Sequence, residues 1–488
     1  MAVLAFLAYC FSITVTVSLL PYSMFITPLR LLIFCLLSGL SIHGIGQEIP
    51  PPPEGKIPVL QIHAENLSPL DIGLEIGRQS KQLFPDIEYR YDSYLTARIT
   101  QMRFNDILRV RLPKLKSHID NAYQKEMEGI ASSWTLIHDN KLGDGYLSWD
   151  EYWVLNLLAD IGLPASGTGF GVLNPVSREK STMVGRNLDL KSTPELRSLQ
   201  AITVYQYYNH AVVNIGFAGI ISVLSGFNDS GLFVAQFNAA TDLSYQTPYP
   251  ARQETGKTMQ TFGFAMRKAL ESMTSVGKAT NLLAKNIYAI SSNILIADNN
   301  NIQVLEYSPV GKAQIRSWKS ETHPDKQWNS PSQIAVVDCH VLNRRSGSCE
   351  KAKDTYRWER LRTQAIFTKN KKAGVQDIAG IMLDSHNQYY EIMASDTLQS
   401  MIYLPGTGHL YLYAAPVNKT TIPPTYKIYY QDILPDKFRN LQKNHYFWWV
   451  LGFLLLLAVA LWLIRRSMTE KTDRNNVDLD NINANRGV

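Results

Sequence analysis

Apolar residues recur every three or four positions over several long stretches of the chain. Residues 71–137, 257–287 and 354–382 show this spacing, which is typical of amphipathic helices packed on a core. A further helix begins at Ser148, a residue type that often caps helices, and runs to about Ile161. We therefore expect helices before, between and after the strand-forming parts of the chain.

The strand-forming parts are short runs rich in Val, Ile, Tyr and Phe, separated by Gly, Asn and Asp. They begin at Thr168 and return over 397–415. The segment 294–309 predicts a β-hairpin, with 298–301 as its turn. Helices and strands in this order predict a layered α+β domain over 56–435.

The C-terminal part contains an apolar stretch with no charged residue, the 19 residues of 446–464. As a helix it would extend ~28 Å, about the hydrocarbon thickness of a bilayer. Arg465 and Arg466 follow it, and the positive-inside tendency places that end in the cytosol. We expect a single C-terminal transmembrane helix over 446–464 and a disordered cytosolic tail over 465–488.

The N-terminal residues 1–47 are also apolar, and we interpret them as a secretory signal or as an N-terminal anchor. Residues 48–55 follow as a Pro-rich, extended spacer. Both interpretations place the domain on the extracytoplasmic side of a membrane. The two cysteines of this exported part, Cys339 and Cys349, form either a disulfide or two free thiols, and export favours the disulfide.

Charge and motif content exclude several classes of partner. The net charge of +6 is spread along the chain without a long Lys/Arg run, which argues against a nucleic acid partner. The sequence contains no metal-ligand spacing, phosphate-binding loop or nucleotide fingerprint, so we expect no metal and no cofactor. Polar residues at strand edges remain, and on spacing alone they are turn residues and surface charges. They are Arg186, Asp189, Asn238 and Asn293.

A series of short stretches along the domain resembles one family, and the stretches follow that family's order. They are Glu126–Ala131, Asp150–Asn156, Thr168–Phe170, Gly185–Asp189, Gly226–Leu232, Phe237–Asn238, Asn293–Asp298 with Glu306, Asp354–Leu361, Leu383–His386 and Thr397–Ser400. Together they resemble the acyl-CoA:6-aminopenicillanic acid acyltransferase family, which is related to acid ceramidase, N-acylethanolamine acid amidase and choloylglycine hydrolase.

The resemblance implies a four-layer αββα N-terminal-nucleophile hydrolase sandwich, in which two antiparallel sheets pack face to face with helices outside. In that family the precursor cuts itself before a Cys. The freed α-amine has a pKa of about 8 and serves as the general base for the thiol. The implied function is an N-acyl amide hydrolase or acyltransferase acting on small acylated molecules, and a membrane anchor fits a lipid-like substrate.

The resemblance also implies roles for particular residues. Arg186 and Asp189 would orient the amine and the nucleophile. Asn238 and Asn293 would donate amide hydrogens to the oxyanion or to the substrate carbonyl. The residue that braces the site would be Arg357, or Arg360 in its place.

The chain departs from the family where the nucleophile is expected. The family pattern is close to Cys-Thr-Gly-Phe, and when it is matched to Phe170 the Cys position holds Gly167. Thr168 is the first alternative nucleophile, after a cut between Gly167 and Thr168, and Ser166 is the second, after a cut at Ala165. Without either, the protein is an inactive relative that binds or scaffolds. A third hypothesis, an unrelated transmembrane receptor, rests on the apolar spans alone.

Overall fold

The computed structural model describes most of the expected domain and one helix beyond it. The described residues are 56–163, 165–239, 259–309, 313–328, 330–342, 349, 352–385, 391–418, 428–439 and 451–466. The predicted leader over 1–47, the predicted spacer over 48–55 and most of the predicted tail over 465–488 lie outside these residues.

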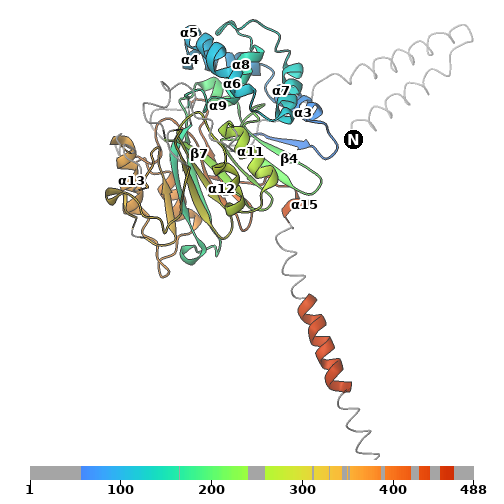
Figure 1. The fold of residues 1–488 in the computed structure, drawn as a ribbon, viewed down its shortest axis with the longest axis vertical. Helices are drawn as coiled ribbons and strands as arrows, with labels where there is room; N and C mark the ends of the chain where they lie inside the picture. The colour runs from blue at the N-terminus through green and yellow to red at the C-terminus, as the bar shows by residue number, and fades with distance from the viewer. Residues whose placement is uncertain are drawn as a thin grey trace, which may run out of the picture. The chain divides into compact units, whose positions relative to one another are not determined.

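The first sheet has eight strands in the order β1-β4-β5-β6-β7-β8-β9-β10 (Figure 1). The strands are β1 Val59–His63, β4 Gln200–Gln206, β5 Ala211–Phe217, β6 Ser225–Asn228, β7 Phe233–Asn238, β8 Ser292–Ala297, β9 Ile302–Tyr307 and β10 Gln314–Arg316. The β8–β9 turn confirms the predicted hairpin, because the backbone N–H of Asp298 donates to the carbonyl of Asn301 at 2.9 Å. This hairpin therefore follows directly from local sequence.

The second sheet has six strands in the order β11-β2-β3-β12-β13-β14. The strands are β2 Ser166–Val172, β3 Met183–Asp189, β11 Gln333–Val336, β12 Thr397–Leu404, β13 His409–Ala414 and β14 Tyr429–Gln431. Strand β2 pairs with β3 on one side and with β11 on the other. β2 is therefore an interior strand. β11 pairs only with its second half, from Gly169 to Val172, and the candidate nucleophiles lie in the first half, which pairs with β3.

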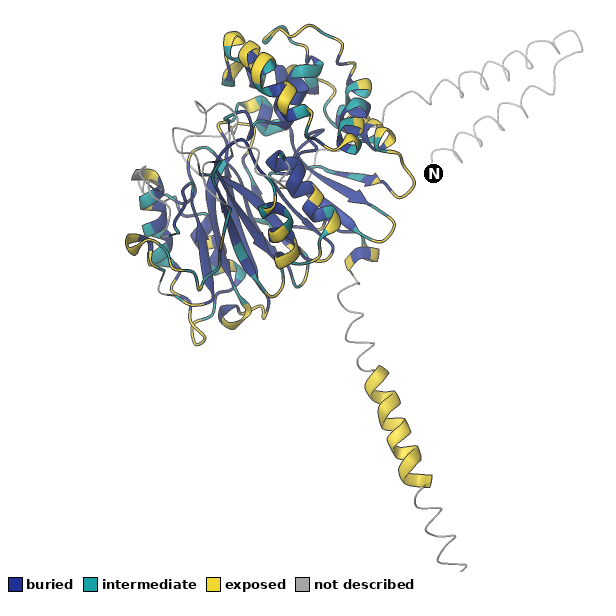
Figure 2. Ribbon diagram, viewed as in Figure 1, coloured by how far each residue is buried: buried dark blue, intermediate teal, exposed yellow. Residues whose placement is uncertain are grey.

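The inner faces of the two sheets share one apolar core. Val204 and Val213 of the first sheet belong to the same buried cluster as Val184 and Met401 of the second. Across this core, the ring of Tyr403 stacks on Phe227 with ring centroids 4.3 Å apart. Alternation along each strand puts every second side chain into this layer, and Figure 2 shows both sheets buried through most of their length.

Helices cover both outer faces of the sandwich. They are α3 Pro69–Leu83, α4 Ile87–Arg98, α5 Gln101–Asp106, the π-helical η2 Ile107–Arg111, α6 Leu112–Lys116, α7 Asn121–Trp134, α8 Trp149–Asn156, η3 Asn174–Val176, α9 Pro194–Ser198, α11 Phe262–Ser272, α12 Val276–Ala284, η4 Pro324–Lys326, α13 Ala352–Gln364, α14 Val375–Met382 and α15 Asp436–Arg439. One outer core contains side chains from α11 and α12, and another contains side chains from α13 and α14. The expectation of a layered α+β domain with two sheets is confirmed.

A buried ion pair joins the N-terminal helices to the helix layer of the first sheet. Arg267 of α11 is fully buried and approaches Glu126 of α7 at 2.7 Å, and it also pairs with Glu271 at 2.9 Å. The guanidinium lies 4.1 Å from the ring centroid of Tyr205 on β4. Because a buried charge is costly without a partner, this pair ties the two helices to one arrangement.

Three expectations require correction. The first sheet is mixed, because β1 and β4 run parallel, with Val59 opposite Ile202. The long helical stretch between them supplies the crossover that parallel pairing needs. The helix from Ser148 ends at Asn156 and not near Ile161. The predicted helix over 354–382 is two helices, α13 and α14.

A separate helix lies near the C-terminus. Residues 451–466 are helical, and the large apolar side chains along it are exposed (Figure 2). The rest of the predicted span, 446–450, lies outside the described residues. Among the helices that the structure describes, none has the length and apolar character needed to cross a membrane.

The close packing of α3 on α7 predicts a sharp contrast between two glycines. A Cβ on Gly73 would lie 1.9 Å from the carbonyl oxygen of Glu126, whereas a Cβ on exposed Gly380 of α14 would meet nothing within 4 Å. We expect Gly73→Ala to lower the free energy of unfolding by about 1–3 kcal/mol, the usual cost of overpacking. Gly380→Ala should raise it by about 0.5–1 kcal/mol, because Ala favours a helix over Gly. Urea denaturation measures both, and equal effects would contradict the packing described here.

Candidate active site

Strands β2 and β3 place the candidate residues on two faces of the second sheet. In their register, Ser166 lies opposite Asp189, Thr168 opposite Asn187, and Gly169 opposite Arg186. Paired residues of antiparallel strands point to the same face, and successive residues alternate. Arg186 therefore points to the inner face, whereas Ser166, Thr168 and Asp189 belong to the outer face.

Arg186 is buried between the two sheets. Its Cζ lies 5.0 Å from the ring centroid of Phe237, and its Nη2 donates to the carbonyl of Gln236 at 2.7 Å. Its Nε and Nη1 have no hydrogen-bond partner among the described residues. Burial lowers the pKa of Arg186 to about 10, although Asp189 and Asp338 oppose this shift. The side chain thus stays cationic at neutral pH and carries unused N–H donors.

Asp189 is held by a buried ion pair on the outer face. Nη2 of Arg357, on α13, lies 2.6 Å from its Oδ2, and the Thr397 hydroxyl donates to its Oδ1 at 2.6 Å. Burial alone would lower the pKa of Arg357, but Asp189 and Asp338 hold it above its ordinary value. Of the two candidate arginines, Arg357 is therefore the one that contacts Asp189. Its alternative Arg360 pairs with Asp384 at 2.6 Å.

A carboxylate that the sequence analysis missed contacts the strand that carries the candidate nucleophiles. The backbone N–H of Gly167 donates to Asp338, with distances of 2.9 Å to Oδ1 and 3.2 Å to Oδ2. Burial raises the pKa of Asp338 well above its usual range, and Asp354 adds to this while Arg357 opposes it. The signal available in the sequence was an acidic residue between the apolar end of β11 and Cys339.

Gly167 has a conformation that other residues rarely adopt. Its φ is +153°, and a Cβ built on it would lie 1.9 Å from the carbonyl oxygen of Asn187. The same Cβ would lie 3.6 Å from Nη1 of Arg186. The position matched to the family's Cys thus faces Arg186 but has no room for a side chain on this backbone.

The two candidate asparagines serve different parts of the site. Nδ2 of Asn293 donates to the carbonyls of Val337 and Cys339, at 3.1 and 2.8 Å, so it holds the residues on both sides of Asp338. Asn238 ends β7, and its backbone N–H donates to the carbonyl of Ala165 at 2.8 Å. Asn238 therefore lies beside the peptide bond that precedes Ser166.

The two candidate hydroxyls differ in access. Thr168 is fully buried, and its Oγ1 has no hydrogen-bond partner among the described residues. On the same outer face, Phe170 packs near Trp328 and Phe367, so this part of β2 lies in an apolar layer. Ser166 is the first residue of β2 and is only partly buried. Solvent and small molecules reach Ser166 more readily than Thr168.

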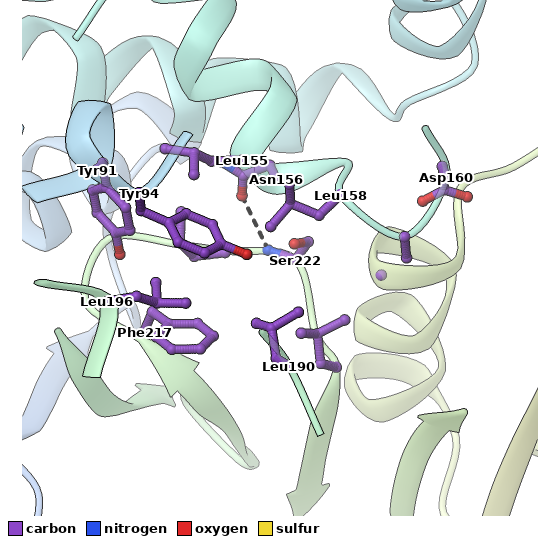
Figure 3. A pocket seen from close by; sticks show the side chains of 14 residues that line it. Tyr91, Tyr94, Leu155, Asn156, Leu158, Asp160, Leu190, Leu196, Phe217 and Ser222 are labelled. Atoms are coloured by element: carbon purple, nitrogen blue, oxygen red, sulfur yellow. Dashed lines mark hydrogen bonds between the residues drawn. The ribbon is translucent and has the colours of Figure 1, made fainter. Parts of the chain in front are cut away.

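A small cavity lies beside the chain that leads to β2. It holds about 30 Å³ and is lined mainly by apolar side chains, among them Tyr94 and Leu158, as well as by Asn156 and Asp160 (Figure 3). Leu190, next to Asp189, also lines it. The cavity thus adjoins residues 155–160, which precede β2 in the chain.

Asp160 is a buried carboxyl in the wall of this cavity. It accepts a hydrogen bond from the backbone N–H of Phe262, at the start of α11, at 3.1 Å. Burial raises the pKa of Asp160 to about 7, although that hydrogen bond opposes the shift. Among the described residues, no group of three or more His, Cys, Asp or Glu side chains is arranged to hold a metal ion.

Comparisons with known proteins give weak likenesses in structure. No protein-family model and no curated protein matches the sequence. A Caenorhabditis elegans ortholog of N-acylethanolamine-hydrolyzing acid amidase is similar with a TM-score of 0.35 and 14% identity, covering 49% of this chain and 93% of its own.

A variant of conjugated bile acid hydrolase from Clostridium perfringens gives a TM-score of 0.36 and 16% identity, with 54% and 92% of the two chains covered. Penicillin V acylase from Agrobacterium tumefaciens gives 0.34 and 11%, with 54% and 86% covered.

The buried carboxyl of Asp160 predicts a pH-dependent effect on stability. Its pKa is raised from 3.8 to about 7 in the folded chain, so its contribution to stability is full below about pH 4 and is lost as the pH rises through 7. Asp160→Asn keeps an acceptor for Phe262 but cannot ionise. We expect the variant to gain on the wild type by a few kcal/mol between pH 4.5 and pH 8 in urea denaturation.

The exposed Asp139→Asn variant is the control, and its difference from the wild type should be the same at both pH values. A constant difference for Asp160→Asn would show that this carboxyl is ionised in the folded protein at acidic pH as well.

Proposed function

We propose that the protein is an N-acyl amide hydrolase or acyltransferase that matures by cutting its own Ala165–Ser166 bond and then uses Ser166 as its N-terminal nucleophile. One observation carries this proposal. The carbonyl of Ala165, directly before Ser166, accepts a hydrogen bond from the backbone N–H of Asn238 at 2.8 Å. A donor at this oxygen polarises the carbonyl and stabilises the negative charge that forms on it during attack.

The maturation reaction consumes one water molecule. The Ser166 Oγ adds to the Ala165 carbonyl carbon, the Ala165–Ser166 C–N bond breaks, and the Ser166 nitrogen takes the hydroxyl proton. The ester that results is then hydrolysed, which frees the Ala165 carboxyl group together with the hydroxyl and α-amine of Ser166. The hydrogen bond between Asp338 and Gly167 holds the strand on the C-terminal side of this bond during the reaction.

The mature site would use its own α-amine for catalysis. An α-amine titrates at about 8, so it can take the Ser166 hydroxyl proton near neutral pH. The oxygen then attacks the substrate's amide carbonyl, the amine portion leaves with the proton, and water or an acyl acceptor resolves the ester. Asp189 lies directly across from Ser166 and can stabilise the cationic amine. The backbone N–H of Asn238, which donates to the Ala165 carbonyl before the cut, can donate to the oxyanion.

Burial favours Ser166 over Thr168 as the nucleophile. The Thr168 hydroxyl is fully buried beside the apolar layer around Phe170, so solvent does not reach it. Ser166 shares its cross-strand position with Asp189 and is partly open to solvent.

A second candidate function is binding without turnover. The specific observation behind it is Gly167, which stands at the family's nucleophile position with a backbone that excludes a side chain. In this case the polar cluster around Asp189 and Arg357 would hold a ligand or simply stabilise the fold. The chain would then stay in one piece.

We further propose that the apolar segment 446–464 anchors the domain on the extracytoplasmic side of a membrane. Its described part is helical, and large apolar side chains such as Leu456 and Trp462 are exposed. The disulfide between Cys339 and Cys349 supports an oxidising compartment for the domain.

Intact mass and N-terminal sequencing of the purified chain distinguish the nucleophiles. We expect a wild-type fragment that begins Ser166-Gly-Thr, an uncut chain for Ser166→Ala, and normal cleavage for Thr168→Ala. Ser166→Thr keeps a hydroxyl at the position and should restore cleavage in part. A cut before Thr168 would instead identify Thr168 as the nucleophile. A wild-type chain that stays uncut and does not hydrolyse acyl amides would contradict the proposed enzyme and favour the binding function.

Membrane fractionation tests the anchor. The full chain should remain in the membrane pellet after alkaline carbonate washing, and a chain that ends at residue 439 should be released. Release of both chains would argue against the anchor.

A further inference from the structure

We propose that Asp338 and the Cys339–Cys349 disulfide form an oxidation-dependent clamp on the amide of Gly167, so that cleavage before Ser166 proceeds only in the oxidised protein. The effect on cleavage before Ser166 rests on the proposed function. The clamp itself stands on contacts that do not depend on cleavage. Asp338 is thereby a positioning residue, which acts on the reacting bond through the neighbouring residue.

The clamp acts one residue beyond the bond to be cut. Both oxygens of Asp338 accept the N–H of Gly167, at 2.9 and 3.2 Å, and the next peptide bond toward the N-terminus joins Ala165 to Ser166. On the other side of that bond, Asn238 holds the carbonyl of Ala165. The two hydrogen bonds therefore fix the backbone before and after Ser166, which sets the direction in which its hydroxyl can approach the carbonyl carbon.

The segment that carries Asp338 is held from one direction by the first sheet. Nδ2 of Asn293 on β8 binds the carbonyls of Val337 and Cys339, which flank Asp338. Further along, the carboxylate of Glu306 on β9 accepts the N–H groups of Val341 and Leu342, both at 3.3 Å. These contacts fix the position of Asp338 relative to β2.

The disulfide holds the same segment from the other direction. It joins Cys339, next to Asp338, to Cys349, and the carbonyl of Cys349 accepts the hydroxyl of Thr355 at 3.0 Å. Thr355 lies in the first turn of α13. The disulfide therefore links the Asp338 segment to the start of the helix that carries Asp354 and Arg357.

Charged groups from α13 and β3 face Asp338. The disulfide holds the α13 groups close to it. Asp354 and Arg357 belong to α13, while Asp189 and Arg186 belong to β3. Arg357 lies 4.0 Å from Asp338 and 2.6 Å from Asp189, so it is shared between two carboxylates that repel each other. Release of α13 from the segment would leave Asp338 free to move from Asp189 toward solvent.

Reduction of the Cys339–Cys349 disulfide would release the clamp. A dithiol reductant delivers two electrons and two protons to the disulfide, which gives two thiols, while the dithiol itself becomes a disulfide. The covalent link between Cys339 and Cys349 is then lost and no longer ties Asp338 to the start of α13.

Hydrogen exchange of the Gly167 amide tests the clamp directly. We would use the full chain with Ser166→Ala, which stays intact in every condition, and follow a fragment spanning 160–172 by mass spectrometry. We expect exchange at Gly167 to rise about tenfold after reduction with dithiothreitol, and equally in Asp338→Ala with the disulfide intact. Asp325→Asn, an exposed acidic residue of η4, is the matched control and should leave exchange unchanged.

Cleavage of the wild-type chain tests the consequence. The fraction cut before Ser166 should fall at least tenfold in Cys339→Ser/Cys349→Ser and in Asp338→Ala, with circular dichroism like that of the wild type. Unchanged exchange after reduction and in Asp338→Ala overturns the inference, whatever happens to cleavage. Exchange that responds as expected in a chain that is never cut supports the clamp and rejects the proposed function instead.

Discussion

Arg357 is the charge on which the candidate site depends. It is buried on α13 between Asp189, which ends β3, and Asp338, which follows β11. The two buried carboxyl groups repel each other, and the cation between them offsets this repulsion. The helix layer, the second sheet and the segment before Cys339 thus meet at one guanidinium, and the backbone of β2 is held against the same group through Gly167.

A stripe of glycines on β2 makes the inner side of this site possible. A Cβ at Gly169 would lie 2.8 Å from the ring of Phe237, and one at Gly171 would lie 2.7 Å from Ile302. With no side chains at these positions, the first sheet approaches β2 closely, and Arg186 lies over Phe237 in the space that remains. The glycines therefore set the distance between the sheets beside Arg186.

Local sequence patterns predicted much of the fold. The turn 298–301 was correct because Asp and Asn stabilise turns through local hydrogen bonds. Strand β11 was missed because it is short and its pairing with β2 joins residues more than 150 positions apart. Asp338 was missed with it. The choice between Arg357 and Arg360 likewise needed the structure, because both lie on α13 and only packing decides which one faces Asp189.

The parallel pairing of β1 with β4 has a consequence for the protein's state after a cut before Ser166. Strand β1 and the helices up to α8 would then belong to one polypeptide, and the remaining strands of both sheets to another. The two products share a sheet through β1, and the buried pair of Glu126 and Arg267 also spans them. They would not separate by simple dilution, so the mature protein would be an obligate heterodimer encoded as a single chain.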